Sequence, residues 1–382
     1  MENILQIRHS LHQNAGLSGD ESFAHDCIEK YLRSLKPEIL ETHVGGYGII
    51  AEFKGEKAGK TVAFRADTDA LPIDEKEECT AGYSSKISGV GHKCGHDGHT
   101  AILLDFAARI AAERPKSGNV VLLFQPEEET GKGAAKLLAS GLLEKLRVDA
   151  VFGLHNLPGV PLGQVAVKYG TFAAASCGMT IKLHGVEAHA AYPADGINPG
   201  NAVAEIIGLV DNVNSANMYN PANPDKFKQI TLICVRLGQP AFGTSAGEAE
   251  VMLTLRAYSN QDMEQLLSDT EARISEISGR NRLKVEISYC EKFHALENRD
   301  EFVDIISRAA TQENLSLMEL DEPRRWSEDF ADYLLKLPGA FFGLGAGSEH
   351  LPLHHPDYDF PDELIETGGR LFYRIAEDFL AR

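Results

Sequence analysis

Short apolar strands alternate with helices along much of the chain, and this alternation restricts the fold more than any other feature. Strands are predicted for GIIAEFKG, TVAFRADTD, NVVLLFQPEEE and DAVFGLHN. A helix is predicted for DGHTAILLDFAARIAAERP, with Asp97 as its N-cap. Because strands joined through helices run in the same direction, the order predicts an α/β fold: a largely parallel sheet flanked by helices.

The pattern changes between residues 169 and 294. Period-2 strands such as EAEVMLTLRAYS accompany amphipathic helices such as NQDMEQLLSDTEARISEIS, which indicates an α+β unit with an antiparallel sheet. After this segment the helix EFVDIISRAATQ and the buried strand AFFGLGAG restore the α/β pattern. We therefore expect one domain made of residues 1–168 and 295–382, interrupted by an inserted domain at 169–294.

Composition excludes several classes of function. The 382 residues carry 37 basic and 56 acidic side chains, a formal net charge of -19, which argues against a nucleic-acid partner and against anionic membranes. The N-terminus has no signal-peptide pattern, and no apolar run reaches the roughly 18 residues of a membrane span. Six cysteines without CxxC spacing are typical of reduced thiols, so we expect a cytoplasmic protein.

The segment HKCGHDGHT concentrates metal-binding side chains in nine residues. Cys94 and His96 offer a thiolate and an imidazole, which suit zinc, manganese, cobalt or nickel better than calcium or magnesium. Taken alone, the segment is also compatible with a polar surface loop whose cysteine is incidental.

More strong ligands follow the predicted strands. Asp67 and Asp69 follow TVAFRA, glutamates 127–129 follow NVVLLF, His155 lies at the end of AVFGL, and His354 lies in the loop after AFFGLGAG. In parallel sheets, ligands bind beyond the carboxyl ends of the strands, so we expect these side chains to meet. They offer more donors than one tetrahedral zinc ion uses, which favours a site for two metal ions.

The three adjacent glutamates allow two interpretations. Alone, they are more typical of a solvated helix start, where carboxylates interact favourably with the helix dipole. At the tip of an apolar strand, one carboxylate can instead bind metal while its neighbour transfers protons, as metal-assisted hydrolysis requires.

Motifs in matching order carry a family resemblance along nearly the whole chain. They are FRADTDALPI, GHKCGHDGHTA, FQPEEETGKGA, GLHNLPG, GVEAHAAYPADGINP, TLRAYS, SEDFADY and LHHPDYDFPD. With them the chain resembles the M20 metallopeptidase family, specifically its amidohydrolase branch of aminoacylases, hippurate hydrolases and auxin-conjugate hydrolases. The resemblance implies two divalent metal ions per subunit and Glu128 as general base. The metal ligands that it implies are Cys94, His96, Glu129, His155 and His354.

Other nearby residues receive less specific roles. Asp69, with Asp67, either orients a ligand histidine from the second shell or simply caps its strand. His99 is expected to be structural, and Glu127 is expected to lie behind the ligands. His355 is a weaker ligand candidate than His354, because the family pattern places the histidine directly after leucine.

The inserted domain contributes two further candidates. His189 resembles a lid histidine that, in dimeric relatives, reaches the partner's active site, and Arg256 resembles a lid arginine available to a substrate carboxylate. Outside their motifs, a histidine between alanines is usually a loop residue and a strand arginine a solvated charge. The stretch FGTSAGEAEV also departs from the Asn-Val-Ile-Pro of many relatives, which leaves carboxylate recognition open.

The predicted activity is hydrolysis of the amide bond of N-acyl amino acids or related small acyl conjugates. A dipeptidase or carboxypeptidase with the same site is the alternative, and a binding protein that has lost its chemistry is a further one. The nucleotide fingerprint of a dehydrogenase and the GxSxG of a serine hydrolase are both missing. We expect a homodimer through the inserted domain.

Overall fold

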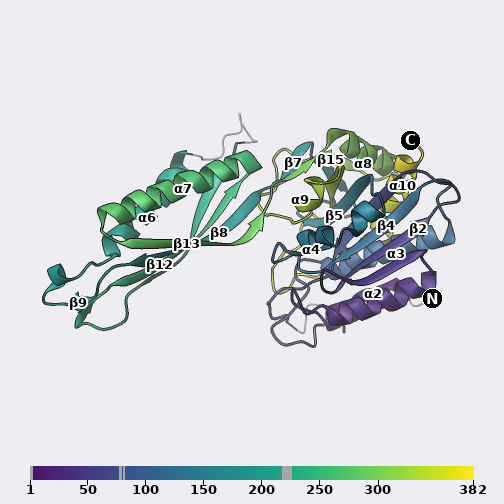
Figure 1. Ribbon diagram of the computed structural model, residues 1–382. Coiled ribbons are helices and arrows are strands. Elements are labelled where there is room, and N and C mark those ends of the chain that lie inside the picture. The colour runs from purple at the N-terminus through teal and green to yellow at the C-terminus, as the bar shows by residue number, and fades with distance from the viewer. Residues whose placement is uncertain (1–2, 77–79, 81, 217–225) are drawn as a thin grey trace. The chain divides into compact units, whose positions relative to one another are not determined.

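A computed structural model describes residues 3–76, 80, 82–216 and 226–382, and the chain divides into two compact units (Figure 1). The first unit comprises Met1–Phe172, Leu296–Asp321 and Asp329–Arg382. The second comprises Ala173–Ala295 together with the short segment Glu322–Glu328.

The first unit is built on a large mixed sheet. Its strands are β1 (Ile39–Val44), β2 (Gly48–Lys54), β3 (Thr61–Asp67), β4 (Asn119–Gln125), β5 (Ala150–Pro158), β6 (Val165–Val167), β15 (Leu317–Glu319) and β16 (Gly339–Gly347). The strand order is β1-β2-β4-β3-β5-β16-β6-β15. The central strands β4, β3, β5 and β16 are parallel, whereas β1, β2 and β6 pair antiparallel with their neighbours. Strands β7 (Gly170–Ala173) and β14 (Leu296–Asn298) form a separate two-stranded sheet.

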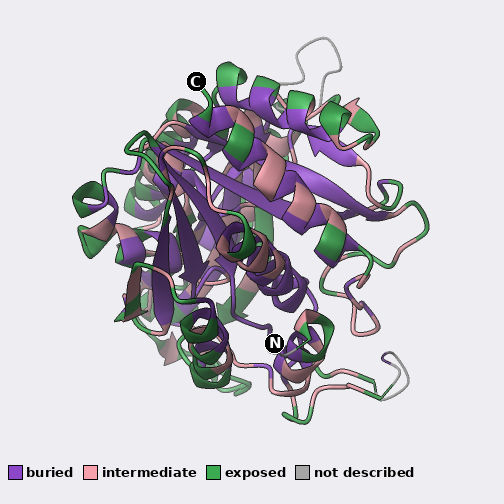
Figure 2. Cartoon of the chain, turned by 90° about the vertical axis from the view of Figure 1, so that its right-hand side faces the viewer, coloured by how far each residue is buried: buried purple, intermediate pink, exposed green. Residues whose placement is uncertain are grey.

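Helices cover both faces of this sheet. They are α1 (Ile4–Gln13), α2 (Ser22–Leu35), α3 (His96–Ala112), α4 (Gly133–Ala139), α5 (Leu142–Lys145), α8 (Asp300–Gln312), α9 (Ala331–Leu334) and α10 (Leu364–Leu380). Alternate strand residues such as Phe64 and Phe152 pack against α1, α2, α3, α8 and α10 in one continuous core. On the opposite face Phe341 contacts Phe330 beside α9. The strands are therefore buried from both sides, as Figure 2 shows in purple, and such burial explains their nearly uninterrupted apolar runs.

The second unit is an α+β layer with an antiparallel sheet. Its elements are β8 (Ala175–His184), β9 (Ala188–His189), the 3-10 turn Pro193–Asp195, α6 (Gly200–Ala216), β10 (Lys228–Leu237), β11 (Thr244–Ser245), β12 (Glu248–Ala257), α7 (Asn260–Arg280) and β13 (Lys284–Phe293). The main sheet has the order β10-β12-β8-β13, with every neighbouring pair antiparallel. Its apolar face packs against α6 and α7. The predicted α/β fold with a separate antiparallel sheet is thus confirmed.

One local prediction was wrong. Asp97 is not the N-cap of this helix. The N-cap of α3 is Gly95, in the left-handed conformation (φ 93°), and the helix begins at His96, two residues earlier than an Asp97 N-cap would give. The Asp97 carboxylate instead lies inside the protein, 3.0 Å from Arg8 Nε and 2.8 Å from His12 Nδ1. Ion pairing with α1 therefore determines where this aspartate points.

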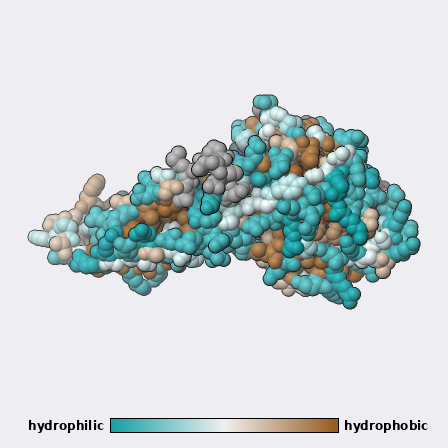
Figure 3. Space-filling model, turned by 90° about the horizontal axis from the view of Figure 1, so that it is seen from above, coloured by the Kyte–Doolittle hydropathy of each residue, from teal (hydrophilic) through white to brown (hydrophobic). Residues whose placement is uncertain are grey.

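The face of the described residues that Figure 3 shows is mostly hydrophilic, with smaller hydrophobic patches. Among the described helices none is both long and apolar enough to cross a bilayer.

Candidate metal centre

Five side chains that lie far apart in the sequence gather at one edge of the large sheet. They are Cys94 before α3, His96 at its start, Glu129 after β4, His155 in β5 and His354 after β16. Their donor atoms form overlapping groups, each within 4.8 Å: Cys94 with His96 and His155, Cys94 with Glu129 and His354, and His96 with Glu128 and Glu129. The structure therefore brings all the predicted ligands together.

His96 is held with one ring nitrogen turned into the cluster. Its Nδ1 lies 2.9 Å from the carbonyl oxygen of Asp69, while Nε2 lies 3.6 Å from Asp67 Oδ2 and 3.8 Å from Glu129 Oε1. Within the described part of the chain, the buried atoms His96 Nε2 and Glu129 Oε1 both lack a hydrogen-bond partner. Buried polar atoms are seldom left unsatisfied, and an imidazole nitrogen facing a carboxylate oxygen is a suitable pair of donors for a transition-metal cation.

Cys94 connects the two sides of the cluster. Its Sγ lies 3.5 Å from His155 Nε2, while His155 Nδ1 contacts the carbonyl oxygen of Asn156 at 2.8 Å. His354 has the left-handed backbone conformation (φ 65°), and its N–H donates to the carbonyl oxygen of Lys93. Since Cys94 belongs both to a group with His155 and to a group with His354, the donor set fits two adjacent ions.

Burial changes the protonation of these donors. Burial raises the pKa of the Cys94 thiol well above its usual range and, with neighbouring Asp69 and Asp67, raises the pKa of Glu129 to about 7. Burial also lowers the pKa of His155. Burial thus favours the neutral forms of Cys94 and His155, and a bound cation would favour the thiolate and carboxylate forms of Cys94 and Glu129.

Asp67 contacts buried side chains next to the ligand cluster. Its carboxylate lies 2.7 Å from Arg65 Nη1 and 2.6 Å from His99 Nδ1, and the other His99 nitrogen contacts the Asn156 side chain. Burial alone would raise the pKa of Asp67, but His96, His99 and Arg65 outweigh it, and the pKa lies well below its usual range. Both ring nitrogens of His99 are therefore occupied by neighbours.

Asp69 contacts the cluster at two points. Besides the carbonyl contact to His96, its Oδ1 lies 3.4 Å from His96 Nδ1, and its Oδ2 accepts a hydrogen bond from the Glu129 N–H at 3.0 Å. This geometry fits an orienting role for Asp69.

The three consecutive glutamates point to different partners. Glu127 has a left-handed backbone (φ 56°) and pairs with Lys136. Glu128 is buried, and its Oε1 accepts a hydrogen bond from the Asp329 N–H at 3.4 Å. Glu129 joins the ligand cluster. One turn of chain thus separates a carboxylate paired with Lys136, a buried carboxylate next to the cluster and a metal-ligand candidate.

The two candidates from the inserted segment lie in the second unit. His189 is exposed on β9, and its Nδ1 accepts a hydrogen bond from the Ala191 N–H. Arg256 on β12 is partly buried, and its guanidinium donates to the carbonyl oxygen of Arg325 at 2.8 Å and to Ser327 Oγ at 3.1 Å. Arg256 is therefore not the solvated strand charge of the simpler interpretation.

Sequence reasoning missed the buried residues that hold these groups. Arg65 joins Asp67 to Asp329, with 2.9 Å between its Nη2 and Asp329 Oδ1. Glu21 accepts a hydrogen bond from the Glu127 N–H in the turn of residues 127–129, called here the glutamate turn. The motif SEDFADY contains Asp329 and was a signal, whereas nothing around Glu21 distinguished it from a surface carboxylate.

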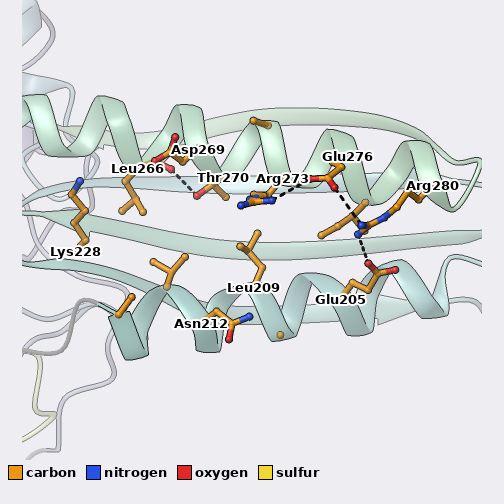
Figure 4. A pocket seen from close by; sticks show the side chains of 15 residues that line it. Glu205, Leu209, Asn212, Lys228, Leu266, Asp269, Thr270, Arg273, Glu276 and Arg280 are labelled. Carbon is orange, nitrogen blue, oxygen red and sulfur yellow. Dashed lines mark hydrogen bonds and ion pairs between the residues drawn. The ribbon is translucent and has the colours of Figure 1, made fainter.

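A groove of about 910 Å³ in the second unit runs between α6 and α7 (Figure 4). Several of its charged side chains pair with one another, as Arg280 does with Glu205 at 2.6 Å. Neither histidine nor cysteine is among the described residues that line it. The groove therefore does not offer the cysteine and histidine ligands that gather at the edge of the large sheet.

Comparison with known proteins identifies the family. The model of peptidase family M20/M25/M40 matches residues 63–378. The chain belongs to the M20 family. This M20 chain is 32% identical over 385 residues to an N-acetyl-L-cysteine deacetylase of Bacillus subtilis, covering 99% of the chain and 88% of the relative. It is 30% identical over 384 residues to thermostable carboxypeptidase 2 of Saccharolobus solfataricus, covering 98% and 95%.

A solved structure agrees. A dinuclear metal-binding M20 peptidase from Bacillus subtilis matches with a TM-score of 0.84 at 28% identity, covering 99% of this chain and 97% of that one. The predicted family and hydrolase class are confirmed.

Proposed function

We propose that this M20 hydrolase cleaves the amide bond of N-acyl amino acids or related small acyl conjugates, using two divalent ions held by the five clustered ligands. The observation that carries the proposal is the pair of buried, unsatisfied atoms His96 Nε2 and Glu129 Oε1, which face each other at 3.8 Å. The deacetylase relative supports an acylated amino acid as substrate. Zinc, manganese, cobalt and nickel all suit these donors.

Glu128 is the proposed general base. When bound, the two ions would polarise the scissile carbonyl and lower the pKa of a water molecule. Glu128 lies in one donor group with His96 and Glu129, where its carboxylate can take a proton from the attacking water and return it to the leaving amine. The hydrogen bond from the Asp329 N–H helps to fix its orientation.

The test is a hydrolysis screen of N-acetyl amino acids on protein loaded with manganese or zinc. Glu128→Gln should lower kcat by about 10²- to 10⁴-fold while leaving metal content unchanged. Glu127→Gln is the matched control, because Glu127 pairs with Lys136 and should be dispensable. Full activity of Glu128→Gln would contradict the assigned base.

A carboxypeptidase or dipeptidase is the second candidate, supported by the carboxypeptidase relative. Both activities would use the same ions and Glu128, and they differ in whether the substrate's amine is free or acylated. Turnover of dipeptides but not of N-acetyl amino acids would favour the second candidate.

His189 is proposed to donate to the developing oxyanion, and Arg256 to bind a substrate carboxylate. Losing an oxyanion donor typically costs about 10²- to 10³-fold in rate, so His189→Ala should lower kcat by that factor. Arg256→Met should raise KM instead. An unchanged KM in Arg256→Met would leave the arginine with its structural contacts to Arg325 and Ser327 alone.

A homodimer through the second unit is also proposed. Strand β10 lies at one edge of its sheet. Exposed apolar side chains on it are Leu232, Ile233, Val235 and Leu237. An exposed edge of this kind favours pairing with another chain. Sedimentation should show a dimer that Ile233→Lys dissociates, and regained activity in a mixture of His189→Ala and Glu128→Gln chains would show that His189 acts across the interface.

A cytoplasmic location is proposed on the chemistry of the thiols. The described cysteines are free, which suits a reducing compartment.

A further inference from the structure

Glu21, the residue before α2, is an acidic side chain buried beneath the glutamate turn. Only 1% of it is exposed. Its Oε1 accepts two backbone hydrogen bonds, from the Gly19 N–H at 2.8 Å and from the Glu127 N–H at 3.0 Å. A single carboxylate oxygen thus ties the loop after α1 to the turn after β4.

The turn needs support because its first glutamate is strained. Glu127 is a non-glycine residue at φ 56°, a conformation that typically costs about 1–2 kcal/mol. Its carbonyl oxygen accepts hydrogen bonds from the N–H groups of Lys132 and Gly133, and its N–H is held by Glu21. Such conformations persist where surrounding contacts determine them.

The left-handed residue separates the three side chains. Because the chain reverses its twist at Glu127, this side chain reaches Lys136, whereas Glu128 and Glu129 enter the donor groups around His96. A relaxed backbone at Glu127 would redirect the two residues that follow it.

A second contact fixes the other side of the turn. Asp69 Oδ2 accepts from the Glu129 N–H at 3.0 Å and from Ser18 Oγ at 2.6 Å. The Ala70 N–H in turn donates to the carbonyl oxygen of Gly16 at 2.8 Å. The loop of residues 16–21 is therefore bonded to both ends of the segment that carries Glu128.

We propose that Glu21 is a positioning residue for the hydrolytic reaction: by accepting the Glu127 N–H, it holds the left-handed turn that aims Glu128 at the reacting water and Glu129 at the ligand cluster. The inference rests on the proposed function for its kinetic consequence. Its structural consequence, an ordered turn, does not depend on any substrate.

The experiment compares Glu21→Gln with Glu21→Met. Gln keeps the carbonyl acceptor and should leave kcat within about 2-fold of wild type, whereas Met fills the same space without an acceptor and should lower kcat by about 100-fold, the cost of a misplacement near 1 Å. KM should change little in both variants, because Glu21 touches no substrate.

A rescue separates positioning from general destabilisation. Glycine adopts the left-handed conformation without a steric penalty, so adding Glu127→Gly to Glu21→Met should recover at least about 10-fold in kcat. Wild-type kcat in folded Glu21→Met, no recovery in the double variant, or a 10-fold loss in Glu21→Gln would each overturn the proposal.

Amide hydrogen exchange gives a readout that needs no turnover. Exchange at residues 127–130 should accelerate at least about 10-fold in Glu21→Met and stay at the wild-type rate in Glu21→Gln. Unchanged exchange in Glu21→Met overturns the positioning role whatever the activity. Accelerated exchange combined with a wild-type enzyme that hydrolyses neither acyl amino acids nor dipeptides would instead refute the proposed function alone.

Discussion

Replacing Glu21 by Gln should stabilise the metal-free protein at pH 8 but much less at pH 5. Burial raises the pKa of this carboxyl to about 7 from an ordinary 4.5, opposed by the hydrogen bond from Gly19 and reinforced by Asp69. Its Oε2 is buried and lacks a hydrogen-bond partner within the described part of the chain. The folded protein therefore holds the proton more tightly than the unfolded chain does.

The sign and size follow from this difference. Because the folded-state pKa is the higher one, the stability contribution is fully present below about pH 4.5 and is lost as pH rises through about 7. Between pH 5 and pH 8 the loss amounts to about 2.5 kcal/mol. Gln copies the protonated acid and cannot ionise, so the variant avoids this loss.

The assay is calorimetry of metal-free wild type and Glu21→Gln from pH 5 to pH 8. Metal-free protein is required because cations near Asp69 would favour the ionised carboxylate. The difference in Tm should grow with pH by about 5 °C, since about 1 kcal/mol corresponds to roughly 2 °C in a unit of this size. A difference that stays constant with pH, while Glu127→Gln behaves as wild type, would refute the reasoning.

Four further outcomes are expected from thermal unfolding. Gly98→Ala places a methyl group 2.3 Å from the ring of buried Phe360 and should destabilise the protein by about 1–3 kcal/mol or more, whereas Gly208→Ala in α6 meets open space and should stabilise by up to about 1 kcal/mol. Asp67→Asn breaks a buried ion pair with Arg65 at 2.7 Å and should cost about 3–5 kcal/mol; an unchanged Tm would show that this ion pair adds no net stability. Chelation should lower Tm and abolish hydrolysis, and manganese or zinc should restore both, because a ligand at 1,000 times its Kd stabilises by about 4 kcal/mol.

The fold and the convergence of the ligands could be predicted from the sequence because both follow from topology. Apolar strands separated by helices predict parallel neighbours, and the side chains after such strands share one edge. Asp67 at the end of β3 and Glu129 after β4 show this rule: each lies at the carboxyl end of one of two neighbouring parallel strands in the centre of the sheet.

The supporting residues could not be predicted in the same way. A buried arginine or glutamate is recognisable only through its partners, and Arg65 meets Asp329 across 264 positions of sequence, while Glu21 meets Glu127 across 106. Local pattern also misplaced Asp97, whose carboxylate is an ordinary N-cap by sequence but is bound by Arg8 in the folded chain. Long-range electrostatics overrode local preference at each of these positions.

The arrangement of charge explains why these partners lie where they do. Asp67 and Asp69 are completely buried beside Glu128 and Glu129, so four carboxylates crowd one edge of the sheet. Arg65 is already engaged by Asp67 and by Asp329, and it stabilises the layer behind the ligands rather than the ligands themselves. Divalent cations would balance the negative charge of the ligand carboxylates. Two backbone N–H groups also hold carboxylates in place: that of Asp329 donates to Glu128, and that of Glu129 donates to Asp69. Metal affinity and the geometry of the glutamate turn are therefore two consequences of the same buried charge.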